Sequence, residues 1–238
     1  MAKAAQQSRR ELIEKMQRDQ ARSDKRRTLL IVAVSIVIGL GIIAVPAVKL
    51  IQDSRVKSQA VADVGVKAAA ASCDAPTDDP AGKSADHRPD GEKIAYAVSP
   101  PSSGPHYQTW APFSKKFYSA EDRPPVENLV HNLEHGYTLL WYNDEIAKDK
   151  DKVALIEKLA KAKLPDAADG GFFIAAPFHV TDGAAWPAGK KIAFSHWSAG
   201  AEGQSLGHRQ FCGDISGEAL TTFINKYPAK DTQEPGLR

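Results

Sequence analysis

The apolar positions of the chain follow two patterns, one continuous and one periodic. Residues 29–48 form a continuous run of twenty positions without a charged side chain. An α-helix rises ~1.5 Å per residue, so this run is about long enough to cross the ~30 Å hydrocarbon core of a bilayer. Residues 29–50 are therefore predicted to form a transmembrane helix, preceded by a separate segment, residues 1–28.

Residues 51–72 follow the predicted span. They contain no aromatic side chain and end in an alanine-rich run, and a segment of this kind has little surface to bury. We expect a linker or a stalk helix here. Residues 73–238 are then long enough for one folded domain with a single hydrophobic core.

Periodicity is strongest in the second half of that domain. Val126, Leu129, Val130 and Leu133 follow the i, i+3, i+4, i+7 spacing of an amphipathic helix. The preceding prolines and the following glycine are typical of a helix start and a helix end. The later pattern predicts a strand at 137–142, a helix at 152–164, strands at 171–178 and 190–197, and a last helix at 216–227.

This order predicts an α+β fold. A helix between the first two strands favours a parallel pair, and the later connection adds an antiparallel neighbour, so we expect a mixed sheet with helices packed on it. The β-α-β-β-α order is loosely thioredoxin-like. However, the chain has no C-x-x-C pair, and a shared fold alone implies no redox activity.

The first half of the domain has a different composition. Residues 74–125 contain nine prolines, which disfavour long helices and central strands. We expect a loop-rich amino-terminal half. Its aromatic residues, which lie between Tyr96 and Tyr118, favour a packed half over a disordered one.

The charge distribution sets the predicted topology. Residues 1–28 hold nine Lys or Arg and four Asp or Glu, a net charge of +5, whereas the whole chain carries +2. Basic segments beside an apolar span stay in the cytoplasm. We therefore expect a single-pass protein of the cell membrane, with its amino terminus inside and residues 73–238 on the extracytoplasmic side.

Two alternatives to this anchor arise from the same residues. A secretory signal peptide has an apolar core of only ~7–15 residues, and the lipoprotein-like stretch at 70–73 follows the apolar run by more than twenty residues. Nucleic-acid binding is disfavoured because the basic residues are mixed with acids and lack aromatic neighbours, which suits anionic lipid headgroups better. We expect membrane lipids, and no nucleic acid, among the partners.

Both cysteines, Cys73 and Cys212, lie on the expected outer side of the membrane. In an oxidising compartment they are most simply one disulfide. Such a bond closes a long loop and would stabilise the domain by about 4–5 kcal/mol. Two free thiols with a redox or metal role remain the alternative.

The densest group of chemically active side chains ends the first predicted helix, in the run His-Asn-Leu-Glu-His at residues 131–135. His131 and His135 leave the apolar stripe on one shared face, at a spacing that lets two imidazoles bind one metal ion. Glu134 is a candidate ligand, base or acceptor for an imidazole N–H. The alternative is a solvated helix face whose histidines interact with the helix dipole.

Further ligands must come from the proline-rich half of the domain. His106 ends the run Pro-Pro-Ser-Ser-Gly-Pro-His at residues 100–106, whose restricted backbone holds a ligand at little cost in entropy. His87 is a weaker candidate, supported by Asp86. We expect structural roles for the histidines without ligand-like spacing, which are His179, His196 and His208.

These segments resemble the Pro-Pro-x-Ser-Gly-Pro-His and His-x-Leu-Glu-His-Gly-Tyr motifs of a family of bacterial single-pass membrane proteins. The matching residues are 100–106 and 131–137, and His87 matches a histidine expected upstream. The resemblance covers roughly residues 73–228. The outer domain of that family is a domain of unknown function, so the resemblance implies the topology and one shared histidine site, but no activity.

The leading hypothesis is a membrane-anchored, extracytoplasmic module that binds Zn(II) or Cu(II), since imidazoles suit both ions. The chain has no methionine beyond residue 16, which argues against a thioether-based Cu(I) carrier. The candidate metal ligands are His87, His106, His131, Glu134 and His135.

Two other functions compete with metal binding. One is an envelope interaction or assembly protein, with an unidentified protein partner and a structural histidine cluster. The other is a zinc-dependent hydrolase, because residues 131–135 match the inverted zinc-peptidase motif, in which two histidines bind zinc and the glutamate activates water. Against the hydrolase, Gly136 ends the predicted helix at once, and no acidic third ligand is evident downstream.

Overall fold

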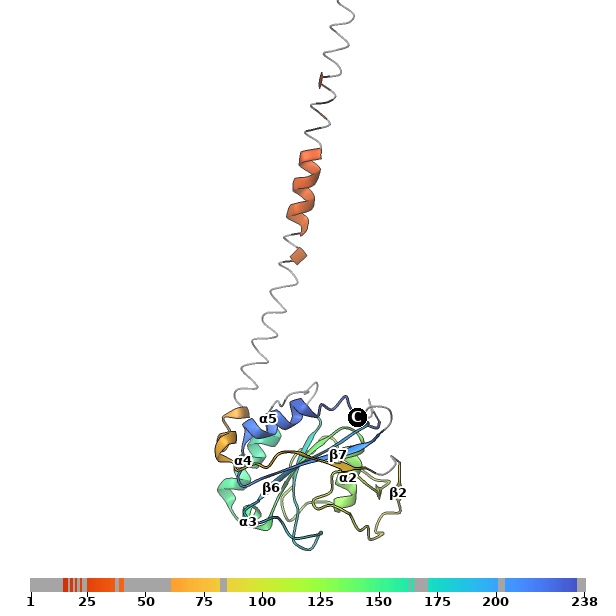
Figure 1. The fold of residues 1–238 in the computed structure, drawn as a ribbon, viewed down its shortest axis with the longest axis vertical. Coiled ribbons are helices and arrows are strands. Elements are labelled where there is room, and N and C mark those ends of the chain that lie inside the picture. Colours follow the sequence, from red (N-terminus) through yellow and green to blue (C-terminus); the bar gives the residue numbers. More distant parts are fainter. Residues whose placement is uncertain are drawn as a thin grey trace, which may run out of the picture. The chain divides into compact units, whose positions relative to one another are not determined.

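The structure is a computed structural model that describes residues 61–81, 85–162, 164, 171–200 and 204–234, with part of residues 15–40. The chain divides into two compact units, residues 1–55 and 56–238, and each is described by itself. In the first unit residues 25–36 are helical (Figure 1). Much of the predicted transmembrane helix lies outside the described residues. Among those described, no helix combines the length and the apolar character needed to cross a bilayer.

A five-stranded mixed sheet forms the centre of the second unit (Figure 1). Its order is β1-β7-β6-β4-β5. The strands are β1 (Thr77–Pro80), β4 (Thr138–Tyr142), β5 (Phe173–Pro177), β6 (Ile192–Ser198) and β7 (Leu206–Cys212). β4 and β5 run parallel, and the other neighbouring pairs are antiparallel. The predicted α+β class with a mixed sheet is confirmed.

Helices pack on both faces of this sheet. They are α2 (Val126–Glu134), α3 (Asp144–Ala147), α4 (Lys150–Lys161) and α5 (Gly217–Lys226). α2 precedes β4, an interior strand of the sheet, and α4 lies between β4 and β5 in the chain, as the predicted crossover requires. Polar side chains cap three helix starts, because Asn143, Asp149 and Ser216 each accept a hydrogen bond from a backbone N–H of the first turn.

Alternation along β4 divides the hydrophobic core in two. Leu139 and Trp141 join the cluster under α2, whereas Leu140 and Tyr142 join the cluster under α4 and α5. All residues of β4 are buried, as expected for an interior strand covered on both faces. The cluster under α2 also contains Trp197, whose indole meets the imidazole of His106 edge to face at 5.9 Å between centroids. This half of the core therefore supports the histidines.

Two strands of the sheet were not predicted. β7 carries Gly207, Arg209 and Gln210, and β1 reads Thr-Asp-Asp-Pro, so neither shows the apolar alternation of a half-buried strand. β7 pairs with β6 along its whole length and with β1 on its other side. Backbone pairing, rather than the local side-chain pattern, decides these two strands: β7 pairs with its neighbour in the chain, β6, and β1 pairs with the distant β7.

The folded unit begins earlier than the predicted boundary at Cys73. Val61 and Val64 are buried in the cluster under α4 and α5. Residues 61–72 are therefore part of the domain rather than of a linker, because the two valines bury apolar surface that an alanine-rich stalk would not have. The rest of the predicted linker, residues 51–60, lies outside the described residues.

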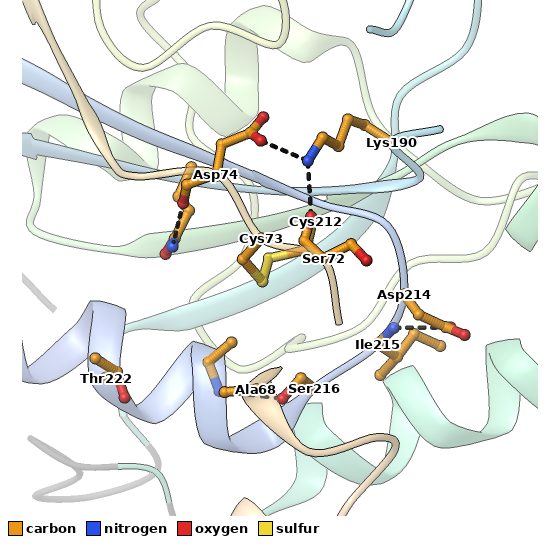
Figure 2. The surroundings of a disulfide bond; sticks show 12 residues. Ala68, Ser72, Cys73, Asp74, Lys190, Cys212, Asp214, Ile215, Ser216 and Thr222 are labelled. Atoms are coloured by element: carbon orange, nitrogen blue, oxygen red, sulfur yellow. Dashed lines mark hydrogen bonds and ion pairs between the residues drawn. A yellow bond between two sulfur atoms is a disulfide. The ribbon is translucent and has the colours of Figure 1, made fainter. Parts of the chain in front are cut away.

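Cys73 and Cys212 form the predicted disulfide, with sulfur atoms 2.03 Å apart and a sequence separation of 139 (Figure 2). It joins the segment just before β1 to the last residue of β7. Lys190 also binds the residues on either side of Cys73. Its Nζ donates to the carbonyl oxygen of Ser72 (2.7 Å) and to the carboxylate of Asp74 (2.5 Å). Neither cysteine is free, so the alternative of two thiols is excluded.

The proline-rich half is loop-rich, as predicted, and it is packed. Between residues 85 and 125 it contains two short strands, β2 (His87–Arg88) and β3 (His106–Tyr107), which form a separate parallel pair. Turns and irregular backbone make up the remainder of that stretch. These two strands carry two of the predicted ligands.

His196 on β6 makes the stability of the domain sensitive to acid. Its side chain is fully buried, and its Nδ1 bonds the carbonyl oxygen of Tyr137 at 3.3 Å. Burial lowers the pKa of His196 to about 4, from 6.5 for the unperturbed side chain. Between these values the unfolded chain binds more protons than the folded one, so the free energy of unfolding decreases as the pH falls from about 6.5 to about 4.

We predict that His196→Asn makes this decrease shallower, because asparagine keeps a donor for the Tyr137 carbonyl oxygen but does not titrate in this range. Urea unfolding at a series of pH values between 4 and 7 measures the slope. Equal slopes in the variant and the wild-type protein would contradict the prediction.

Candidate metal centre

The centre is built on the carboxyl-terminal half of α2. Leu129 and Leu133 are fully buried in the cluster under this helix, which turns His131 and Glu134 away from that cluster and toward the proline-rich half. Gly136 has a φ of 85° and ends the helix, as a glycine after the last helical turn typically does. The predicted short amphipathic helix is confirmed.

The polar face of α2 is buried rather than solvated. His131 and Glu134 on this helix, and His135 directly after it, are at most 3% exposed, so the alternative of a solvated helix face is excluded. The loop around residues 106–113 covers this face, and Asn132 anchors the loop. The Asn132 side chain accepts a hydrogen bond from the Ala111 N–H and donates one to the Ala111 carbonyl oxygen, both at 3.0 Å.

His87 and His106 are direct partners across the β2–β3 pair. Their rings meet edge to face, with centroids 4.8 Å apart. The backbone N–H of His106 donates to the carbonyl oxygen of Asp86 at 3.2 Å. The carbonyl oxygen of Pro105 accepts a hydrogen bond from the Tyr96 hydroxyl at 2.9 Å. Strand pairing thus brings together two imidazoles that are distant in the sequence.

Four of the five predicted ligands meet at one point. One ligand atom from each of His87, His106, His131 and Glu134 lies within 4.8 Å of the other three. Glu134 Oε2 is 3.0 Å from His106 Nε2 and 3.7 Å from His87 Nε2. The ring centroid of His131 lies 4.7 Å from that of His106 and 5.0 Å from that of His87. Of the four, His87 is the most exposed, with 31% of its side chain accessible, so it marks the open side of the centre.

Backbone carbonyl groups orient two of the imidazoles. His106 Nδ1 bonds the Gly104 carbonyl oxygen at 2.9 Å, and His131 Nδ1 bonds the Tyr107 carbonyl oxygen at 2.6 Å. Because a carbonyl oxygen only accepts, each Nδ1 carries the proton in these bonds. The Nε2 atoms then keep a lone pair, which is the tautomer that binds a metal through Nε2.

The protonation states also suit metal binding. Burial lowers the pKa of His131 to about 4. Burial by itself would raise the pKa of Glu134, but the contact of Oε2 with His106 and the hydrogen bond from the Ala85 N–H, 2.5 Å from Oε1, outweigh it and lower that pKa. At neutral pH His131 is therefore neutral and Glu134 is ionised, the forms in which imidazole and carboxylate bind metals.

His135, the fifth predicted ligand, lies outside this group of four. Its ring packs 4.8 Å from that of His131 and edge to face with Trp110 and Phe113. Neither of its ring nitrogens has a hydrogen-bond partner among the residues that the structure describes, and Nδ1 is 3.6 Å from Glu234 Oε2. The helix ends one residue earlier, so helical spacing does not fix the direction of this side chain. Its role as a ligand stays a prediction.

The remaining histidines are hydrogen-bonded elsewhere in the domain. His179 Nδ1 lies 2.5 Å from the carboxylate of Asp144. His208 bonds Asp78 through Nδ1 and the Ser198 hydroxyl through Nε2, both at 2.7 Å. With His196 they lie outside the group of four, which agrees with the structural roles expected for them.

Sequence reasoning missed several groups that shape the centre. The carbonyl groups and the N–H that orient the ligands belong to the backbone, and no sequence pattern marks them. Trp110 is a missed neighbour, with its ring edge to face with His131 at 5.3 Å and 45% of the residue exposed. Its position four residues after His106, in the segment that covers α2, was the available signal.

A substitution at Asn132 tests whether this residue anchors the loop around residues 106–113 to α2. We predict that Asn132→Leu, which keeps the number and branching of the side-chain heavy atoms but removes both hydrogen bonds to Ala111, lowers the free energy of unfolding by about 1–3 kcal/mol. The buried Ala111 carbonyl loses its partner, and the Ala111 N–H keeps only its longer bond to the Asn128 carbonyl oxygen at 3.4 Å. Urea unfolding of the metal-free protein measures the change. A loss below about 0.5 kcal/mol would show that the loop is not anchored in this way.

Comparison with known proteins adds the family but no activity. Residues 87–238 match the DUF3105 family, described as a protein of unknown function. The matched range begins at His87 and contains all four clustered residues. No curated protein and no solved structure matches the chain. The family agrees with the expected resemblance to a domain of unknown function, and the match extends over more than half of the chain. The protein therefore belongs to the DUF3105 family.

Proposed function

We propose that this protein binds one transition-metal ion, Zn(II) or Cu(II), through His87, His106, His131 and Glu134. The observation that carries the proposal is the meeting of three imidazoles and one carboxylate within 4.8 Å. Three of the four side chains are buried, and the fourth opens to solvent, so an ion has a way in.

The short contact between His106 Nε2 and Glu134 Oε2 requires a positive charge shared between the two atoms. His106 Nδ1 donates to a carbonyl oxygen, so a neutral ring has only a lone pair on Nε2, which faces the carboxylate oxygen at 3.0 Å. Two acceptors at this distance repel each other unless a proton or a metal ion is shared between them. Donor atoms on a tetrahedral zinc ion are about 3.3 Å apart. Glu134 Oε2 lies 3.0 Å from His106 Nε2 and 3.7 Å from His87 Nε2, one distance below and one above that value.

The donor set restricts the metal. Imidazole nitrogen and carboxylate oxygen suit Zn(II) and Cu(II), whereas Cu(I) prefers thiolate and thioether sulfur. Both cysteines are in the disulfide, and the chain has no methionine after residue 16. The negative end of the α2 dipole, beside Glu134, also favours a cation.

Glu134 fits a ligand better than a catalytic base. In the inverted zinc-peptidase motif both histidines hold the ion and the glutamate stays free to activate water. Here His135 stands outside the group, while Glu134 is inside it, with Oε1 accepting a hydrogen bond from the Ala85 N–H and Oε2 facing His106 Nε2 at 3.0 Å. We therefore favour metal binding over the hydrolase alternative.

We further propose that the domain is extracytoplasmic and held at the cell membrane by one amino-terminal span. The support comes from the sequence, namely the twenty uncharged residues 29–48 after a segment with a net charge of +5. A disulfide suits an oxidising compartment outside the cytoplasm. Membrane lipids would be the partners of the span.

Metal content tests the proposed function directly. We predict one bound ion per chain after equilibrium dialysis of the purified protein against Zn²⁺ or Cu²⁺, measured by mass spectrometry of the metal. The His106→Ala, His131→Ala double variant should bind less than a tenth as much, because half of the ligand set is lost. His179→Ala is the matched control, since His179 lies outside the group, and it should bind one ion.

Two results would contradict the proposal. One is a wild-type protein without bound metal. The other is a double variant that binds as much as the control. If the double variant loses stability and neither the wild-type protein nor any variant binds metal, the histidines form a structural cluster. That result would favour the alternative of an interaction or assembly protein.

A further inference from the structure

The residue that supplies the carboxylate is also the last residue of α2. The final carbonyl groups of a helix have no partner within the helix. The Glu134 carbonyl oxygen instead accepts a hydrogen bond from the Thr232 hydroxyl at 2.6 Å and one from the Glu234 N–H at 3.3 Å. Thr232 is 98 positions away in the sequence and only 5% exposed. A distant, buried hydroxyl thus closes the end of the helix at the metal centre.

The chain around Thr232 is closely fitted to this helix end. A Cβ at Gly136 would lie 2.5 Å from the Ala229 carbonyl oxygen and 3.1 Å from the Thr232 Cβ. The next residue, Gln233, is anchored on the other side, since its Nε2 donates to the Ser198 carbonyl oxygen at 2.7 Å. We call residues 228–234 the carboxyl-terminal strap. It is held between β6 and the end of α2.

We propose that Thr232 is a positioning residue for the metal centre. By holding the Glu134 backbone, it keeps the carboxylate of the same residue within reach of His106 and His87. The inference rests on the proposed function, because it concerns the affinity of that same site. Groups that orient a ligand without touching the metal typically change metal affinity 10- to 100-fold when they are removed.

Thr232→Val tests this role, because valine keeps the shape of threonine and removes only the hydroxyl. Thr222→Val is a matched control. The Thr222 hydroxyl also donates to a helix carbonyl oxygen, that of Glu218 at 2.9 Å, but on α5 and at an exposed position. Thr232→Ser restores a hydroxyl and is the rescue variant.

The readout is the Kd for Zn²⁺, measured by competition with a chromogenic chelator on the full chain, together with the Tm of each metal-free protein. We expect Thr232→Val to raise the Kd about tenfold, and Thr222→Val and Thr232→Ser to leave it within twofold of the wild-type value. The Kd is measured well below every Tm, so that all variants are folded.

A Thr232→Val protein with a lower Tm and an unchanged Kd would overturn the inference, because the hydroxyl would then support the fold alone. An equal rise in Kd for both valine variants would also overturn it. If the wild-type protein binds no Zn²⁺, the proposed function fails first and this inference fails with it, and that result is distinct from the other two.

Discussion

The burial of the Glu134 carboxylate is the constraint on which the rest of the structure depends. An ionised carboxylate without exposed surface is costly unless charges and hydrogen bonds compensate it. Glu134 obtains this compensation from His106 and from the Ala85 N–H, which belong to the proline-rich half. The carboxylate therefore couples α2 to that half of the domain, and the anchoring through Asn132 follows from the same coupling.

Different groups of the domain hold the ligands in place and offer the ligand atoms. The sheet and the core under α2 hold the helix, backbone carbonyls orient the imidazoles of His106 and His131, and the ligand atoms themselves are left facing one another. A metal ion would satisfy the buried carboxylate and the imidazole lone pairs at once. The open side at His87 distinguishes the group from a sealed structural network.

Much of this architecture could be predicted from local pattern. The helix at 126–134, the strands and helix from β4 to β6 and the last helix follow from apolar periodicity, prolines and caps, because their own residues select these conformations. β1 and β7 escaped prediction because backbone pairing with β7 and β6, rather than an apolar pattern of their own, creates them. The early start of the domain escaped because two buried valines in residues 61–72 are a weak signal.

In the site, too, the side chains could be predicted from the sequence, whereas their tertiary and backbone contacts could not. His87, His106, His131 and Glu134 were predicted from residue type and spacing, and the structure brings them together. The predicted site also included His135, but helical spacing cannot place a residue beyond the helix end. Thr232 and the orienting carbonyls have no sequence signature, since their role depends on tertiary contact.

The most direct test of the central claim is zinc K-edge X-ray absorption of the protein loaded with one equivalent of Zn²⁺. We expect four ligands at about 2.0–2.1 Å, with the scattering pattern of three imidazoles and one carboxylate. A spectrum dominated by water oxygen, without imidazole scattering, would contradict this claim.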